Sequence, residues 1–413
     1  MNSRPYYTLD DLNTDNKVVL LRIDINSPLN PETGEILDDT RFKSHKKTIY
    51  ALDDSKVVLL AHQSRPAKKD FTTLKSHKNK LEEVLNRPIG YVEDIIGKYA
   101  REKIKKMENG DIILLENVRF LSEEVIDMSP EMMTQTIFVK TLSNLADLYI
   151  NDAFAASHRA QPSIVGFPLV MPSSAGLLME KEINELSLAL NNNSSPATFV
   201  FGGNKVSDTL KVIKNILNGK KVDKILLVGL VANFFLFSKG IDIGEQNIEN
   251  LKREGVLEYK DEAKKILKEN PDKIILPVDL AVKKDGKRED IDIVSLPTKY
   301  PICDIGIETF VKFSKLIKES EIVIINGPAG IFEEKEFSYG TYEILRAAGE
   351  AKHSIIGGGH TASVAHMLNL EKKVSHISTG GGASIEFLSG EKLPGIEALE
   401  KSKTRFKIPD IEL

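Results

Sequence analysis

Short runs of consecutive apolar residues recur along the chain, separated by stretches with helical spacing of apolar positions. The first half contains KVVLLRIDI, KVVLLAH, GDIILLEN and LADLYIND, and the second half contains PATFVFGG, KILLVGLV, KIILPVD, EIVIING, HSIIGGG and VSHISTGGG. The runs lack a clear alternation of apolar and polar positions, which is typical of strands buried on both faces of a parallel sheet. Because strand and helix alternate, the pattern predicts an α/β fold with doubly wound parallel sheets.

The length of the chain and one polar break predict two domains. The 413 residues exceed one typical domain. AGLLMEKEINELSLAL has helical spacing and runs into the breaker NNNSSP. We therefore expect an N-terminal lobe over 1–174, a connecting hinge helix over 175–195, a C-terminal lobe over 196–395 and a C-terminal segment over 396–413. The last segment is too polar to fold alone, so it is either a frayed tail or a strap that packs back on the N-terminal lobe.

Composition narrows the class of protein. The chain is 41% hydrophobic and 28% charged, and its net charge of −4 argues against a general nucleic-acid binder. Cys303 is the single cysteine, which rules out an intramolecular disulfide. The first residues lack an apolar signal core, and no run approaches the roughly 18 apolar residues of a membrane span. We expect a cytoplasmic enzyme without nucleic-acid or membrane partners, a monomer by default with a homodimer as the alternative.

Polar and cationic side chains follow several predicted strands of the first half, where an open α/β sheet binds its ligands. The candidates are Asp24, Asn26, Arg41, His62, Ser64, Arg65, Asn117, Arg119, Asp152, His158 and Arg159. Guanidinium groups bind carboxylates and phosphates through paired hydrogen bonds, so four arginines at successive strand ends predict a site for a small, multiply charged anion. A single arginine could equally pair with a surface carboxylate, and the two histidines could be packing residues. Arg22 lies within a strand, and we expect it to form a structural ion pair.

Glycine-rich turns follow several predicted strands of the second half. VFGGNKVSDTLKVI places Lys205 at the start of a helix, and VIINGPAGIFE ends with Glu333. SIIGGGHTASV and SHISTGGGAS add two more turns, and the first contains the candidates Gly357, Gly358, Gly359, His360 and Thr361. The free N–H groups of a helix start bind anions, so several such turns at one sheet edge imply an extended phosphate ligand such as a nucleotide.

Two familiar nucleotide-binding patterns fit poorly. The P-loop pattern GxxxxGK[ST] is absent. GGGHTA does satisfy GxGxxA, so a nicotinamide-dependent dehydrogenase is an alternative. The dinucleotide pattern also needs an acidic residue at the end of the next strand, and here that strand ends in TGGG. The dehydrogenase hypothesis is therefore disfavoured, and an inactive α/β binding protein is a third alternative.

Nine short segments, taken in order along the chain, carry the most specific signal. They are VVLLRIDINSPL, AHQSRP, LLENVRF, NDAFAASHRA, GGNKVSD, LPVDLAV, INGPAGIFE, IIGGGHTASV and VSHISTGGGAS…LPG. Together they resemble the phosphoglycerate kinase family from about Lys17 to Leu399. The resemblance implies two Rossmann-like lobes joined by a helix, with the acidic sugar phosphate on the first lobe and Mg²⁺ with ATP or ADP on the second. It also implies reversible phosphoryl transfer from 1,3-bisphosphoglycerate to ADP, giving 3-phosphoglycerate and ATP.

The resemblance also implies roles for individual residues. Arg41 and Lys205 would stabilise the transferring phosphoryl group, and Glu333 and the loop from Gly357 to Thr361 would bind the nucleotide. The residues that would bind the triose are Asp24, Asn26, Arg41, His62, Ser64, Arg65, Arg119, His158 and Arg159. The attacking group is a carboxylate that is already ionised, so catalysis needs alignment, charge stabilisation and exclusion of water, and no general base.

Two positions depart from the pattern of many relatives, in a way that resembles the archaeal branch of the family. Thr209 stands where many relatives have a second lysine, four residues after Lys205. His360 stands where many relatives have an aspartate associated with Mg²⁺. Because Mg²⁺ prefers oxygen ligands, we expect nucleotide phosphates and water to hold it, with no metal ligand from the protein. His360 would then donate a hydrogen bond to phosphate or water, or else merely fill the turn.

Overall fold

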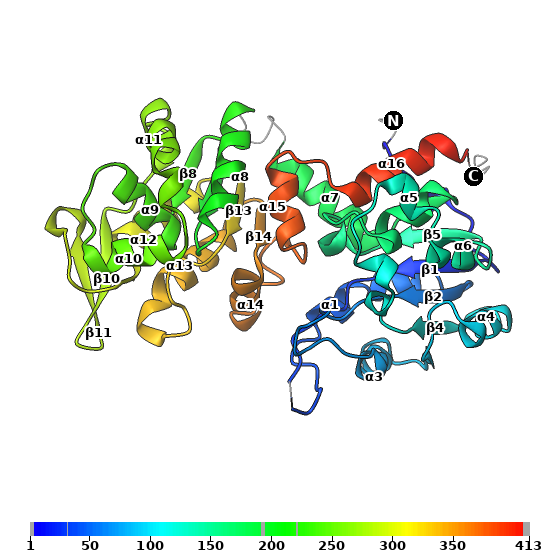
Figure 1. The fold of residues 1–413 in the computed structure, drawn as a ribbon. Coiled ribbons are helices and arrows are strands. Elements are labelled where there is room, and N and C mark those ends of the chain that lie inside the picture. The colour runs from blue at the N-terminus through cyan, green and yellow to red at the C-terminus, as the bar shows by residue number, and fades with distance from the viewer. Residues whose placement is uncertain (1–3, 31, 191–194, 220–221, 408–413) are drawn as a thin grey trace. The chain divides into compact units, whose positions relative to one another are not determined.

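The computed structural model describes residues 4–30, 32–190, 195–219 and 222–407 (Figure 1). The chain divides into two compact units, Met1–Ile183 with Lys392–Leu413 (the N-terminal unit) and Asn184–Glu391 (the C-terminal unit). Each unit contains a six-stranded parallel sheet. The predicted α/β fold with two doubly wound parallel sheets is therefore confirmed. Among the described residues, no helix has the length and apolar character that crossing a bilayer requires.

The sheet of the N-terminal unit has the strand order β3-β4-β2-β1-β5-β6. Its strands are β1 (Val18–Arg22), β2 (Lys56–Leu60), β3 (Gly90–Val92), β4 (Ile112–Leu115), β5 (Leu148–Asn151) and β6 (Ser173–Ala175). The helices of this unit are α1 (Thr40–Ser44), α2 (Lys46–Tyr50), α3 (Lys75–Leu85), α4 (Lys98–Lys105), α5 (Pro130–Met133), α6 (Ile137–Ser143) and α16 (Pro394–Arg405). Helix α7 (Leu177–Ala189) runs across the boundary into the C-terminal unit.

The strands of this sheet are buried on both faces. Val19 and Leu21 of β1 belong to one apolar cluster, whereas Leu20, between them, belongs to a second cluster. Because successive side chains of a strand point to opposite faces, the two clusters cover the two sides of the sheet. This explains why the sequence shows unbroken apolar runs without alternation.

Helix α16 packs against the N-terminal unit. The N–H of Gly395 donates to the carbonyl of Ser157 at 2.9 Å, and Ala398 belongs to an apolar cluster with Ile164. A Cβ at position 395 would lie 2.7 Å from Oγ of Ser157, so glycine permits the close approach. Residues 408–413 of the predicted C-terminal segment, and 191–194 of the predicted connecting helix, lie outside the described residues.

The parallel sheet of the C-terminal unit has the strand order β15-β14-β13-β7-β8-β9. Its strands are β7 (Ala197–Phe201), β8 (Lys224–Leu227), β9 (Ile274–Ile275), β13 (Ile322–Asn326), β14 (Ser354–Gly357) and β15 (His376–Ile377). The helices of this unit are α8 (Val206–Asn218), α9 (Gly229–Ser238), α10 (Glu245–Arg253), α11 (Lys260–Glu269), α12 (Ile307–Lys318), α13 (Tyr339–Ala348), α14 (Gly359–Met367) and α15 (Gly382–Leu388).

A three-stranded antiparallel sheet, absent from the sequence-based prediction, also lies in the C-terminal unit. It consists of β10 (Asp279–Lys284), β11 (Lys287–Asp292) and β12 (Ile302–Ile305). Asp285 and Gly286 join β10 to β11 with φ of 50° and 79°, the left-handed pair that a tight hairpin requires. The Asp-Gly dipeptide was a usable signal in the sequence.

Strand β7 is the centre of the C-terminal sheet, with β8 on one side and β13 on the other. Phe201, the last residue of β7, pairs with Asn326 of β13 and Leu227 of β8. The strands therefore end at the same level, and the loops that follow them begin at one edge. The chain leaves β7 toward β8 on one side and leaves β13 toward β14 on the other side, and open α/β sheets bind their ligands at such a point.

Candidate active site

Loops that follow four strands of the N-terminal unit come together at one edge of the sheet. The N–H of Ser64 donates to Oδ1 of Asn26 at 2.8 Å, which joins the loops after β2 and β1. Arg119 donates from Nη1 to the carbonyl of Ser64, which adds the loop after β4. Arg159, on the loop after β5, lies close enough to Arg119 to lower its pKa. The structure thus brings the predicted triose-binding residues together.

Asp24 holds Arg41 at this edge. Nη1 of Arg41 donates to Oδ2 of Asp24, and Oδ1 of Asp24 accepts from the N–H of Asn26 at 3.1 Å. Burial opposes the charged form of Asp24, but the charge of Arg41 and the N–H of Asn26 outweigh it and hold the pKa of Asp24 below its ordinary value. The carboxylate therefore stays ionised and fixes the guanidinium of Arg41.

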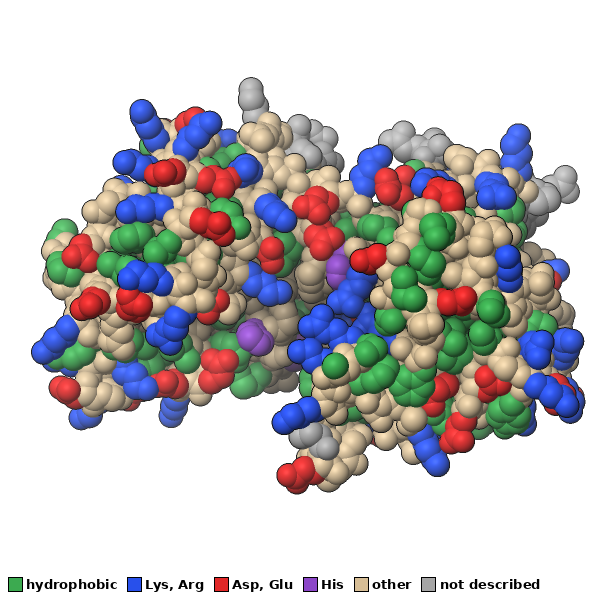
Figure 2. Space-filling model, viewed as in Figure 1, with side chains coloured by type: hydrophobic (Ala, Val, Ile, Leu, Met, Phe, Trp, Pro, Cys, Tyr) green, Lys and Arg blue, Asp and Glu red, His purple; other side chains and the backbone are tan. Residues whose placement is uncertain are grey.

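The other three predicted arginines have no carboxylate partner within the described part of the chain. Arg65 and Arg159 are exposed, and neither forms an ion pair there. Arg119 is 5% exposed, and burial, followed by the nearby Arg159 and Arg22, lowers its pKa to about 10. The alternative that each arginine pairs with a surface carboxylate therefore fails for these three. Figure 2 shows basic side chains gathered on this unit around α1.

His62 is buried and neutral beside a buried arginine. Arg22 donates from Nη2 to Nδ1 of His62 at 2.9 Å, so Nε2 of His62 carries the proton. Burial and the charge of Arg22 hold the pKa of His62 well below its ordinary value. His158 is half-buried, and burial together with Arg159 lowers its pKa as well. Both rings are therefore uncharged at neutral pH. Nε2 of His62 carries a proton that it can donate to an anion, whereas Nε2 of His158 accepts from Nε of Arg159 at 3.1 Å.

Arg22 differs from its predicted role as one half of an ion pair. Its Nε donates to Oγ of Ser163 at 3.0 Å, and the same hydroxyl donates to Oε1 of Glu124. Ser163 therefore stands between the guanidinium of Arg22 and the buried carboxylate of Glu124. Direct contact is replaced by a bridging hydroxyl, a geometry that no pattern in the sequence signals.

His45, which the sequence analysis did not single out, links this edge to the start of α7. Its Nδ1 lies 2.7 Å from Oδ2 of Asp152, and its Nε2 accepts from the N–H of Asp24 at 3.0 Å. Oδ1 of Asp152 accepts from the N–H groups of Leu178 and Met179 in the first turn of α7. Asp152 is thus a helix-capping residue, and His45 fixes the backbone of Asp24.

We expect His45→Ala to lower the free energy of unfolding by roughly 2 kcal/mol or more, because it leaves a buried carboxylate oxygen and a buried N–H unpaired. Chemical denaturation measures the change. His366→Ala is the control, since His366 pairs with Glu371 at the surface and should cost no more than about 0.5 kcal/mol. Superimposable denaturation curves for wild type and His45→Ala would contradict the structural role of His45.

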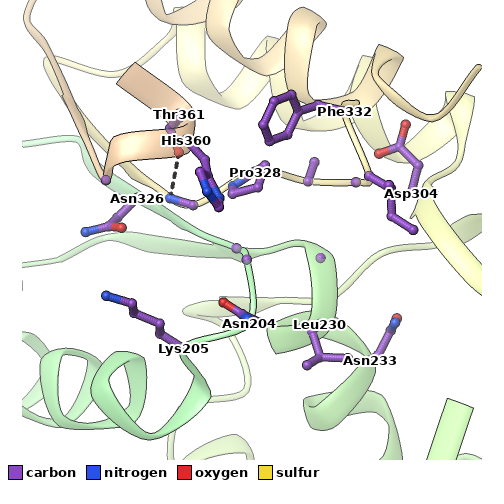
Figure 3. Close-up of a pocket in the computed structure, with 18 of the residues that line it drawn as sticks. Asn204, Lys205, Leu230, Asn233, Asp304, Asn326, Pro328, Phe332, His360 and Thr361 are labelled. Carbon is purple, nitrogen blue, oxygen red and sulfur yellow. Dashed lines mark hydrogen bonds between the residues drawn. The ribbon is translucent and has the colours of Figure 1, made fainter. Parts of the chain in front are cut away.

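The C-terminal unit contains a cavity of about 660 Å³ at the edge where β7, β8, β13 and β14 end. Lys205, Glu333, Gly358, Gly359, His360 and Thr361 line it, so the structure places six of the seven predicted nucleotide-binding residues around one space. Gly357, the seventh, is the buried last residue of β14 and is not among the lining residues. Figure 3 shows Lys205 and His360 on facing sides of the cavity.

Several of the glycines serve loop packing, and fewer are free to bind phosphate than the sequence suggests. A Cβ at position 202 would lie 2.3 Å from the carbonyl oxygen of Pro328, and one at 327 would lie 2.3 Å from that of Gly202. Gly327 also has a φ of 91°, which favours glycine. By contrast, a Cβ at position 359 would meet nothing within 4 Å. The open N–H groups at the start of α14, near Gly359, are therefore the better anion site.

Of the other side chains predicted to bind the nucleotide, some are exposed and others form hydrogen bonds within the protein. Lys205 is the N-cap of α8 and is exposed, as is Glu333. Thr361 is 1% exposed, and its Oγ1 accepts from the N–H of Gly327 at 3.1 Å, so its hydroxyl holds the loop after β13. Thr209 donates from Oγ1 to the carbonyl of Lys205 at 2.9 Å and supports that residue without adding charge.

His360 is exposed in the first turn of α14 and lies against an aromatic ring. The centroids of the His360 and Phe332 rings are 5.8 Å apart and the rings are tilted by 55°. Figure 3 shows the His360 ring directed into the cavity beside Phe332. The side chain therefore faces the space that a ligand would occupy. This argues against the alternative that His360 only occupies the turn and contacts no ligand.

Asp304 is a lining residue that the sequence analysis missed. It is 3% exposed, and Nη1 of Arg288 lies 2.9 Å from its Oδ2. Burial raises the pKa of Asp304 to about 6, against the opposing effects of the Gly340 N–H and Arg288. Arg288 lies on β11 of the hairpin that was also missed. The pair therefore attaches the antiparallel sheet to the wall of the cavity.

Comparison with known proteins gives the family. The model of the phosphoglycerate kinase family matches residues 9–391. The chain belongs to this family. It is 50% identical over 403 residues to the phosphoglycerate kinase of Methanothermus fervidus, covering 97% of this chain and 98% of that protein. The corresponding protein of Archaeoglobus fulgidus is 50% identical over 394 residues, covering 95% and 96%.

Solved structures of phosphoglycerate kinases resemble the whole chain. The crystal structure from Pyrococcus horikoshii matches with a TM-score of 0.90 at 43% identity, covering 97% of this chain and all of that one. The structure from Coxiella burnetii matches with a TM-score of 0.79 at 32% identity, covering 96% and 99%. The predicted family, and its similarity to archaeal members, are confirmed. The dehydrogenase alternative finds no support.

Proposed function

We propose that this phosphoglycerate kinase catalyses reversible phosphoryl transfer between 1,3-bisphosphoglycerate with ADP and 3-phosphoglycerate with ATP. The observation that carries the proposal is the division of chemistry between the units. The N-terminal unit presents Arg65, Arg119 and Arg159 without carboxylate partners in the described chain, which suits the carboxylate and phosphate of a triose. The C-terminal unit presents a cavity with Lys205 and an open helix start, which suits a nucleotide.

In this proposal the triose lies at the edge formed by the loops after β1, β2, β4 and β5. The side-chain amide of Asn26 and Nε2 of His62 would donate hydrogen bonds, and the arginines would neutralise charge. Ser64, which donates to Asp70, and His158, which accepts from Arg159, would line the site. In the direction of ATP consumption, a carboxylate oxygen of 3-phosphoglycerate bonds to the γ-phosphorus while the bond to the β–γ bridging oxygen breaks. No proton is transferred, so Arg41 and Lys205 act by stabilising charge on the transferring phosphoryl group. Since the substrates are assigned to different units, turnover requires a conformational step.

Mg²⁺ is the expected companion of the nucleotide, because a divalent ion neutralises the phosphates during transfer. His360 faces the cavity but offers an imidazole, a poor ligand for this hard ion. We propose that nucleotide phosphates and water hold the ion and that His360 donates a hydrogen bond to phosphate or water. The protein is proposed to act in the cytoplasm as a monomer on these small molecules.

His360→Asp tests this proposal. The carboxylate would add a direct oxygen ligand, so we expect the Mg²⁺ concentration at half-maximal rate to fall about threefold or more, because each added charged ligand strengthens binding. Rates measured across a Mg²⁺ titration at fixed ADP give the comparison, and His360→Asn controls for loss of the ring without adding charge. An unchanged titration midpoint in the aspartate variant would contradict the proposal.

The activity itself is tested by following ATP formation from 1,3-bisphosphoglycerate and ADP with the full-length chain. We expect turnover that depends on both substrates. Absence of ATP formation by folded wild-type protein would refute the proposed reaction and favour a binding protein.

A further inference from the structure

One loop forms a continuous part of the cavity wall in the C-terminal unit. All residues of 326–333, at the end of β13 and after it, line the cavity, and Glu333 is the last of them. Glu333 is exposed and forms no ion pair within the described part of the chain. A free carboxylate only accepts hydrogen bonds and repels phosphate, so the hydroxyls of the ribose are its natural partners in a nucleotide. The position of this carboxylate depends on what fixes the chain immediately after it.

The chain after Glu333 is held by the hairpin of β10 and β11. Nζ of Lys283, on β10, donates to Oε1 and Oε2 of Glu334 at 3.0 and 2.7 Å. Arg288, on β11, donates from its N–H to Oε2 of Glu336 and from Nη1 to the carbonyl of Glu336, both at 2.9 Å. Two basic residues of the hairpin therefore bind two of the first three residues after the cavity wall.

Arg288 also connects this segment to the carboxylate behind the loop. Its Nη1 donates to Oδ2 of Asp304 at 2.9 Å, and its side chain is only 10% exposed. A Cβ at position 330 would lie 2.6 Å from Oδ1 of Asp304, so this carboxylate packs directly against the loop. Figure 3 shows Asp304 and Phe332 along one side of the cavity. Because the guanidinium is planar and its partners are fixed, it determines where the backbone of Glu336 lies.

We propose that Arg288 and Lys283 are positioning residues that hold Glu333 where it binds the ribose of the nucleotide. The inference rests on the proposed kinase activity and names the contacts that fix one of its binding residues. Neither basic residue is among the described residues that line the cavity, so both act through Glu333. The ribose is not part of the group that is transferred, so its contact stabilises ground state and transition state alike. Loss of either positioning residue therefore raises KM for the nucleotide and leaves kcat nearly unchanged.

The test compares ADP with 2′,3′-dideoxy-ADP, which lacks both ribose hydroxyls. For wild type we expect kcat/KM to be about tenfold higher with ADP, because hydrogen bonds to a carboxylate are stronger than those between neutral groups. Glu333→Ala should bring this ratio to within about twofold of unity. Arg288→Met and Lys283→Met should each lower the ratio about threefold or more and keep kcat within about threefold of wild type. The ratio does not depend on the amount of active enzyme, so a variant that only folds less well leaves it unchanged.

Lys284→Met is the matched control. Lys284 follows Lys283 on β10 but pairs with Glu289 within the hairpin at 2.8 Å, so its loss should leave the ratio at the wild-type value. A ratio near unity in wild type, an unchanged ratio in Glu333→Ala or an equal fall in Lys284→Met would overturn the inference.

Lys283→Met decides the matter even if Arg288→Met fails to fold. The side chain of Lys283 is 35% exposed, so its replacement leaves no buried charge without a partner. An unchanged ratio in Lys283→Met would overturn the inference while normal turnover of ADP left the proposed function standing. Absence of turnover with ADP in wild type would instead overturn the proposed function and this inference together.

Discussion

Arg41→Ala is expected to lower kcat by on the order of 10³-fold, because it removes a cation from the phosphoryl group at the moment its charge is redistributed. Asp24 fixes the guanidinium of Arg41 before substrate binds, and the same carboxylate accepts from the N–H of Asn26. The cation is thus prearranged, and preorganisation is what makes such a group effective. Steady-state rates with saturating ADP and 1,3-bisphosphoglycerate measure the effect.

Two further variants separate the catalytic role of Arg41 from a general loss of structure. Arg41→Lys keeps the charge but loses the planar fork, so it should recover only part of the rate. Arg87→Ala removes an arginine that also pairs with an aspartate, Asp53, but lies just before β3, at the opposite ends of the strands. We expect its rate to stay within about twofold of wild type. A kcat of Arg41→Ala equal to that of Arg87→Ala would refute the catalytic role.

The grouping of the proposed triose-binding residues at one sheet edge could be predicted because parallel strands end together. Asp24, Ser64, Arg119 and Arg159 each follow an apolar run, and in a parallel sheet the residues that follow such runs share one edge. No pattern of this kind predicts His45. It lies between α1 and α2 and reaches Asp24 and Asp152 only through the packing of those helices on the sheet. Contacts of this kind depend on tertiary structure alone.

The sequence predicted which loops surround the proposed nucleotide cavity, but not which of their glycines are open to a ligand. Glycine is used both where a ligand approaches and where two loops cross, and the sequence does not distinguish these uses. Gly359 is open, whereas Gly202 and Gly327 face each other's backbones.

Lys205→Ala is expected to lower kcat by about 10²- to 10³-fold, the usual effect of removing one group that stabilises transition-state charge. Lys205 is the N-cap of α8, a helix of 13 residues, so its ammonium adds to the positive end of the helix dipole. It is also the only lysine among the described residues that line the cavity. Thr209 stands where a second lysine would add charge, and its hydroxyl is already bound to the carbonyl of Lys205. Lys205 is therefore the one residue at this helix start that supplies an ammonium charge to the cavity, and Thr209 on the same helix face cannot replace that charge.

Lys211 supplies the matched control for this prediction. It lies on the same helix and is exposed, but it is not among the residues that line the cavity. Lys211→Ala should therefore keep kcat within about twofold of wild type while removing the same net charge from α8. Lys205→Arg keeps a cation at the helix start and should recover more rate than Lys205→Ala. Equal rates for the alanine variants at 205 and 211 would show that only the overall charge of α8 matters, and would remove Lys205 from the reaction.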